Sequence, residues 1–154
     1  MSHYPILFGL RDIIQGNGFL AVVAVQGRAL LHDEDSGEVW VEGVNPGGFA
    51  ATGNSVAEAL EDFRRSYRAI LFDIAEDAAS FEIFEEQVEA FFDASPEALE
   101  REWQQAVQDL RAGRLTADWL GRRSADLPRA ITVVRLDEPA AENNEMEEGA
   151  ALAA

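Results

Sequence analysis

The sequence predicts an α+β domain in which a three-stranded antiparallel meander precedes one long helix. Short β-favouring runs separated by turn residues indicate the meander, and apolar residues that recur at three- and four-residue steps indicate the helix. A length of 154 residues suits one domain with its own core. We therefore expect residues 1–136 to form a single domain that carries a helical extension at about 80–113.

The first strand of the meander is expected within residues 19–31, a dense run of β-favouring side chains. Gln26 and Gly27 interrupt this run, either as a turn or as a bulge within one longer strand. Residues 1–14 are of mixed character and predict only a short lead-in element.

Two further strands complete the predicted meander. The polar residues 33–37 suit a hairpin loop, and residues 38–41 alternate as the second strand. Asn-Pro-Gly-Gly at 45–48 then turns the chain into a short third strand at 49–52.

The long helix is predicted to begin after Ser55, because Ser55 and Glu58 fit a capping box. A second helix is expected at about 81–92, and a third is expected to open with Ser95 as its cap and Pro96 as its first residue. The apolar positions that place the long helix on the sheet are Val56, Leu60, Phe63, Tyr67, Ile70, Leu71 and Ile74.

The C-terminal part of the chain is expected to contain the end of the third helix, a strand and a tail. Gly113 is expected to end the third helix, and residues 131–136 suit a closing strand. Residues 137–154 are acidic, Ala-rich and without periodicity, which is typical of a disordered tail.

Acidic residues dominate the charge, since 29 Asp and Glu against 12 Lys and Arg leave a net charge of −17, and every base is arginine. This field disfavours direct nucleic-acid binding and favours a basic protein partner. A chain without cysteine has neither disulfides nor a thiolate metal site, and two histidines exclude a His-rich metal cluster. With no signal segment and no apolar run long enough to span a bilayer, we expect a cytoplasmic protein.

No pattern indicates a catalytic centre or a cofactor. The Gly-Asn-Gly at 16–18 precedes a strand instead of joining a strand to a helix, so it does not indicate a dinucleotide site. The acidic residues of the loop at 33–37 lack the spacing of a calcium loop. His32 is expected to be solvated in a loop. The basic residues expected on the solvated face of the long helix are Arg64, Arg65 and Arg68.

Trp40 is the residue that best suggests a binding surface. It shares its strand face with Glu38 and Glu42, and a free meander would leave that face exposed. An exposed tryptophan between acids suits an interface with a basic partner. The alternative is that the C-terminal helices or another subunit cover Trp40. The aromatic stripe of the second helix is interpreted as core or dimer packing: Phe81, Phe84, Phe91 and Phe92.

Residues 41–60 (VEGVNPGGFAATGNSVAEAL) resemble the signature of the HicB-like family. In that family a strand leads into a Pro-Gly turn, here at 46–48, and a short strand follows. A Gly-[Asp/Asn]-[Thr/Ser] cap then comes before a Glu-Ala-Leu helix start, here at 53–55 and 58–60. The resemblance extends from Gly18 to about Asp77. It implies a partial RNase H-like module that binds partners and has no catalytic centre.

HicB proteins are best known as antitoxins that block HicA, a small basic ribonuclease, and many repress their operon through an appended DNA-binding domain. The chain after Asp77 has no recognisable domain of that kind. If residues 131–136 are the closing strand of the family, residues 81–113 are a two-helix insertion before it.

We therefore expect a non-catalytic, orphan HicB-like interaction protein without a cofactor, which binds a protein or forms a homo-oligomer. Two alternatives stay open. The first is an antitoxin that neutralises a HicA-type ribonuclease. The second is a small-ligand-binding protein or an enzyme, with a pocket between the sheet and the helices within 81–113.

Overall fold

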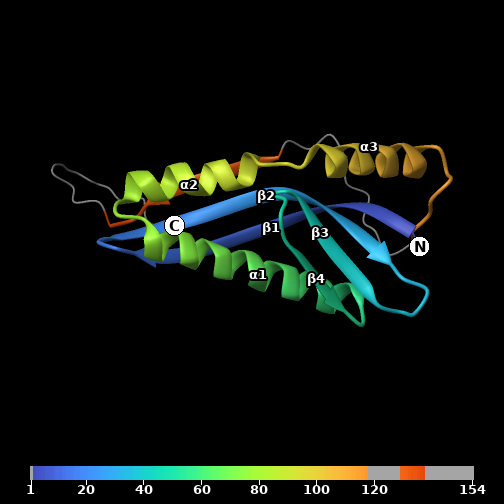
Figure 1. Cartoon of the computed structure of the whole chain (residues 1–154), viewed down its shortest axis with the longest axis horizontal. Helices are drawn as coiled ribbons and strands as arrows, with labels where there is room; N and C mark the ends of the chain where they lie inside the picture. Colours follow the sequence, from blue (N-terminus) through green and yellow to red (C-terminus); the bar gives the residue numbers. More distant parts are fainter. Residues whose placement is uncertain (1, 118–128, 138–154) are drawn as a thin grey trace.

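The computed structural model describes residues 2–117 and 129–137. It confirms the predicted α+β class, with an antiparallel sheet and three helices (Figure 1). The elements follow one another as β1 (Ser2–Gly16), β2 (Phe19–Asp33), β3 (Val39–Asn45), β4 (Ala50–Gly53), α1 (Val56–Asp77), α2 (Phe81–Asp93), α3 (Glu97–Arg111) and β5 (Ala130–Arg135).

Strand β2 is the centre of the five-stranded sheet. It pairs with β1 over its whole length. Its other edge is divided, because residues 21–26 pair with β5 and residues 28–33 pair with β3. Strand β4 pairs with β3, and all of these pairings are antiparallel. The predicted closing strand therefore joins the sheet, whereas residues 138–154 of the predicted tail lie outside the described residues.

The N-terminal residues form a 15-residue strand instead of the short lead-in element that was expected. A tight turn at Asn17 and Gly18 joins β1 to β2, so every residue of β1 has a partner. Gln26 and Gly27 do not interrupt β2, which continues through both and stays in register with β1. The irregularity lies in β3, where Arg28 pairs with Asn45 and Ala29 with Gly43, so Val44 is the extra residue.

Helices α1 and α2 pack on one face of the sheet and share its main core. Phe63 of α1 stacks on Phe49 with ring centroids 4.5 Å apart, and Phe84 of α2 lies 5.0 Å from Phe19. Phe84 and Phe92 are buried within the chain, so the aromatic stripe of α2 is core packing.

Helix α3 packs on the opposite face of the sheet. Trp103, Ala106 and Val107 form a second, smaller core with Leu30 of β2 and Val44 of β3. Neighbouring side chains of a strand point to opposite faces, which explains why Leu31 belongs to the main core and Leu30 to the small one.

The helix caps agree with the sequence at α1 and differ at α3. Glu58 N–H donates to Ser55 Oγ at 3.1 Å, which confirms the predicted cap. The prediction for α3 is wrong by one residue, since Pro96 is the cap residue and no side chain caps the helix. The hydroxyl of Ser95 is directed instead toward Glu100, at 3.4 Å from Oε1.

Two of the three arginines expected on the solvated face of α1 contact β1. Arg64 Nε donates to the Gly9 carbonyl at 3.0 Å, and Arg68 pairs with Asp12. Only Arg65 has the predicted exposed position, paired with Asp62 on its own helix. The sequence pattern could not reveal these contacts because it did not predict β1.

These contacts protect the free edge of β1. The Asp12 carboxylate accepts the N–H of Ile13 at 2.8 Å, and Arg64 occupies the carbonyl of Gly9. Pro5 has no N–H to offer. Occupied or missing backbone groups discourage another strand from pairing with an edge.

Tyr67 offers a test of the main core. The residue is fully buried, its hydroxyl has no hydrogen-bond partner among the described residues, and burial raises its pKa. Tyr67→Phe keeps the ring and removes an unpaired polar atom. We expect the free energy of unfolding in urea to rise by about 1 kcal/mol. A fall in stability would show that the hydroxyl has a partner in solution.

Candidate functional site

The structure brings Trp40 and its two predicted acidic neighbours together. Trp40 lies in β3 opposite His32 of β2 and Thr52 of β4, and its side chain is 41% exposed. Glu38 precedes β3, and its Oε1 accepts a hydrogen bond from Trp40 Nε1 at 3.0 Å. Glu42 lies two residues further along the strand and therefore on the face of Trp40.

His32 is not the solvated loop residue that was expected, because β2 continues to Asp33. Its side chain is only 12% exposed, and Nε2 lies 3.2 Å from Glu42 Oε1. The ring of His3 meets the ring of His32 edge-on, with centroids 4.5 Å apart. His3 Nδ1 in turn lies 3.8 Å from Glu102 of α3. We call Trp40, Glu38, Glu42, His32 and His3 the Trp40 surface.

Helix α3 packs on the face of the sheet from which Trp40 projects, but it does not cover Trp40. It lies over Leu30 and Val44, and its contact with the Trp40 surface is the approach of Glu102 to His3. Within residues 2–117 and 129–137, the C-terminal helices therefore leave Trp40 accessible.

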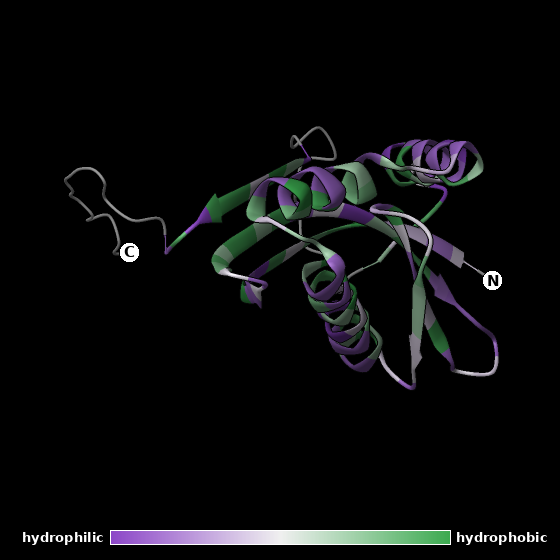
Figure 2. Ribbon diagram, turned by 60° about the vertical axis from the view of Figure 1, so that its left-hand side comes forward, coloured by the Kyte–Doolittle hydropathy of each residue, from purple (hydrophilic) through white to green (hydrophobic). Residues whose placement is uncertain are grey.

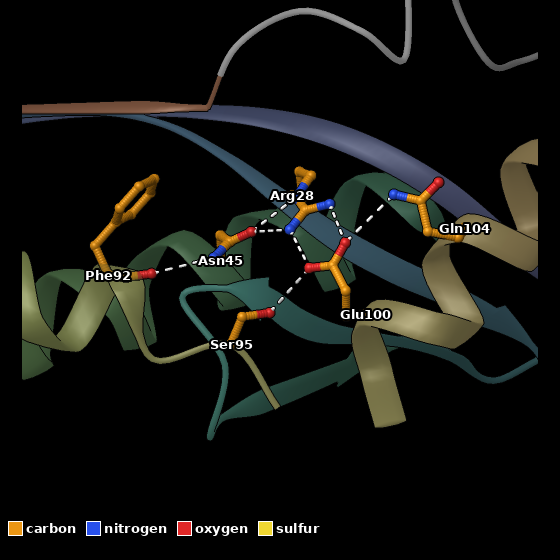
Figure 3. A network of polar contacts seen from close by, with 6 residues as sticks. All are labelled: Arg28, Asn45, Phe92, Ser95, Glu100 and Gln104. Atoms are coloured by element: carbon orange, nitrogen blue, oxygen red, sulfur yellow. Dashed lines mark hydrogen bonds and ion pairs between the residues drawn. The ribbon is translucent and has the colours of Figure 1, made fainter. Parts of the chain in front are cut away.

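A second polar cluster lies beneath α3 and is centred on Arg28, which is 4% exposed (Figure 3). Its Nε donates to Asn45 Oδ1 at 2.7 Å, and its Nη1 donates to Glu100 Oε2 at 2.8 Å. Asn45 is also buried, and its Nδ2 donates to the Phe92 carbonyl at 3.3 Å. We call Arg28, Asn45 and Glu100 the Arg28 clasp.

The Arg28 clasp joins four elements. Arg28 belongs to β2, Asn45 to β3 and Glu100 to α3, and the Phe92 carbonyl belongs to the last turn of α2. The guanidinium also lies over the ring of Trp103, with Cζ 4.8 Å from the ring centroid. The clasp thus fixes α3 against the sheet, and we assign it a structural role.

Arg28 determines the acidity of its carboxylate partner. Its hydrogen bonds lower the pKa of Glu100 from 4.5 to about 2, although partial desolvation acts in the opposite direction. A carboxylate with a lowered pKa in the folded state stabilises the fold above the unfolded-state value and loses that contribution as the pH falls toward the folded-state value.

The sequence offered a weak signal for this clasp. Arg28 is the only charged residue between Phe19 and Leu31, an apolar stretch where a charge needs a partner. Glu100 lies three residues before Trp103, on the same side of α3. Nothing local in the sequence connects the two residues.

Within the described part of the chain, no group of three or more His, Cys, Asp and Glu side chains is arranged to hold a metal ion. In the same residues no helix has both the length and the apolar character needed to cross a bilayer. The acidic hairpin tip is closed by backbone hydrogen bonds between Glu34 and Glu38, and between Gly37 and Glu34.

Comparisons with known proteins identify no relative of this chain: no family model, no curated protein and no solved structure matches it.

Glu100→Gln tests the contribution of the clasp. At pH 7 we expect a loss of about 1–3 kcal/mol in the free energy of unfolding, toward the lower value because the Glu100 side chain is 35% exposed. The wild-type chain should lose this contribution between pH 4.5 and about 2, and the variant should have a shallower pH dependence there. Denaturant unfolding across this pH range is the measurement. Glu97→Gln is the control, since the Glu97 side chain is 89% exposed and its partner Arg101 lies on the same helix. Equal losses in both variants would contradict the assignment.

Proposed function

We propose that this chain is a non-catalytic, HicB-like protein-interaction domain that binds its partner through the Trp40 surface. The observation that carries the proposal is a large aromatic side chain held in place on an exposed strand face. Trp40 is 41% exposed, Glu38 fixes its indole nitrogen, and His32 holds Glu42 beside it. Exposed aromatic residues within a polar rim are typical of protein-binding surfaces.

Close contacts in the HicB-like stretch support the family part of the proposal. A side chain at Gly53 would begin 2.7 Å from the Ala59 backbone nitrogen, so the turn into α1 requires glycine. Ala59 is fully buried and lets α1 lie close to β4. The return of β5 to the sheet after α2 and α3 agrees with a closing strand preceded by a two-helix insertion.

The packing of α2 favours an interaction protein over the alternative with a pocket beneath the helices. Phe84 and Val88 are fully buried, and Phe92 is nearly so. These side chains pack in the main core, and Trp103, Ala106 and Val107 of α3 pack in the second core, on the sides of both helices where that alternative places its ligand. The antitoxin alternative uses the same Trp40 surface, because a HicA-type ribonuclease is a small basic protein.

Trp40→Ala tests the binding surface. Since the side chain is already partly solvated, we expect the melting temperature to change little and partner binding to fall at least tenfold, a hot-spot loss. The measurement is affinity purification from the native host, followed by binding assays with the captured protein in purified form. Phe72→Ala is the matched control, because Phe72 is 42% exposed on α1. If both variants retain a partner that the wild type binds, the Trp40 surface is not the binding site.

Self-association is a second part of the proposal, and a separate surface favours it. Ile13 and Val134 are 55% and 51% exposed, and both lie beside Val22 in neighbouring strands. Figure 2 shows β5 as a largely hydrophobic strand at the margin of the sheet. In contrast to β1, this edge has no protecting side-chain contact to its backbone among the described residues.

The charges near β5 suit pairing with a second copy. Leu136 N–H donates to the Leu20 carbonyl of β2, so the odd-numbered residues of β5 direct their backbone groups toward the free edge. In an antiparallel pair centred on Val133, Arg129 of each copy would lie opposite Asp137 of the other. This register places opposite charges together at both ends.

Val134→Asp tests this pairing. A carboxylate in the exposed apolar row adds charge repulsion between copies, and we expect the dimer to dissociate into monomers with the fold unchanged. Sedimentation velocity over a range of concentrations is the measurement, and Phe72→Asp is the control. A wild-type chain that stays monomeric at all concentrations would refute self-association.

A further inference from the structure

The Arg28 clasp shows how this fold surrounds a guanidinium group. The planar cation lies over the Trp103 ring at 4.8 Å, and carboxylate oxygens of Glu100 accept its terminal N–H groups. An indole face with acceptors in the plane of the cation is the arrangement that suits arginine. Glu100 is held in turn by Gln104, whose Nε2 lies 3.3 Å from Oε2.

The Trp40 surface contains the same kinds of groups without a cation. Glu38 binds the indole edge at 3.0 Å, and Glu42 lies on the same strand face. His32 holds Glu42 at 3.2 Å, as Gln104 holds Glu100. Among residues 2–117 and 129–137, no arginine is paired with Glu38 or Glu42.

We propose that the group bound at Trp40 is the guanidinium of an arginine side chain on a basic protein partner. The proposal rests on the proposed function and specifies its partner chemistry. The guanidinium stacks on the exposed face of Trp40 and donates to the carboxylates of Glu38 and Glu42. The net charge of −17 attracts such a partner from a distance.

The proposal distinguishes arginine from lysine. Both cations respond to the overall charge, but the planar guanidinium also stacks on an indole and donates to two acceptors at once. An ammonium group is a more strongly hydrated point charge and lacks that geometry. A surface that recognises only charge would treat the two alike.

The experiment compares two blocked peptides of equal length and charge, one of Gly-Arg repeats and one of Gly-Lys repeats. Each is titrated into the ¹⁵N-labelled full chain, and the indole N–H signal of Trp40 is assigned by its loss in Trp40→Phe. We expect the Gly-Arg peptide to bind about two- to fivefold more tightly and to shift this signal. In Trp40→Leu, its affinity should fall to that of the Gly-Lys peptide.

Two controls separate charge from stacking. Glu38→Gln keeps an acceptor for the Trp40 nitrogen and removes one charge, so it should weaken the Gly-Arg peptide without exposing the core. Phe72→Leu on α1 should have no effect on either peptide. Equal affinities for the two peptides, unchanged in Trp40→Leu, would overturn the proposal.

Failure of the guanidinium proposal can be distinguished from failure of the proposed function. If Trp40→Ala loses the native partner while the two peptides bind alike, the Trp40 surface is an interface but not a guanidinium site. If neither the partner nor the peptides depend on Trp40, both proposals fail.

Discussion

The change of partner along β2 is the constraint on which the rest of the structure depends. At Gly27 the chain comes so close to β3 that a side-chain carbon would lie 2.3 Å from the Asn45 carbonyl oxygen and 2.5 Å from the Phe8 ring. Only glycine fits there, and the pairing with β3 shifts immediately afterwards. Because β3 covers only residues 28–33 of β2, the preceding part of the same edge is free for β5. Arg28, the charged residue next to Gly27, donates a hydrogen bond to Glu100 of α3, the helix that covers the face opposite to the main core.

The elements predicted from the sequence are those determined by neighbouring residues. Ser55 caps α1 through Glu58, three residues away, and the apolar period of α1 is visible without any partner. The strand β1 was missed because Gly9, Arg11 and Asp12 interrupt its pattern, while its stability comes from pairing with β2 and from contacts with α1. The cap expected at Ser95 was wrong for a related reason. Its hydroxyl is directed toward Glu100, and the position of Glu100 is determined by Arg28, 72 residues earlier.

The candidate site was predictable to the same extent. Alternation within one strand places Trp40 and Glu42 on the same side, and Glu38 is close in sequence, so these three residues could be grouped from the sequence. His3 and His32 could not be added to them. Their contact depends on the register between β1 and β2, and the contact of His32 with Glu42 depends on the register between β2 and β3. Neither register was available from the side-chain pattern, because β1 was not predicted as a strand and the predicted first strand of the meander ended at residue 31, before His32.

Trp103 is buried and Trp40 is exposed, although both lie on the same side of the sheet. Trp103 is 3% exposed because the Arg28 clasp holds α3 over Leu30 and Val44, and this position leaves Trp40 uncovered on the same face. From α3 a chain of contacts leads to the surface: Glu102 approaches His3, His3 meets His32, and His32 holds Glu42. The contact of His32 with Glu42 is made within the paired strands β2 and β3, and Glu102 extends it to α3 by way of His3. The exposed surface and the ion pair beneath α3 are thus joined by side-chain contacts, while the position of Trp40 itself is determined by β3 and by Glu38.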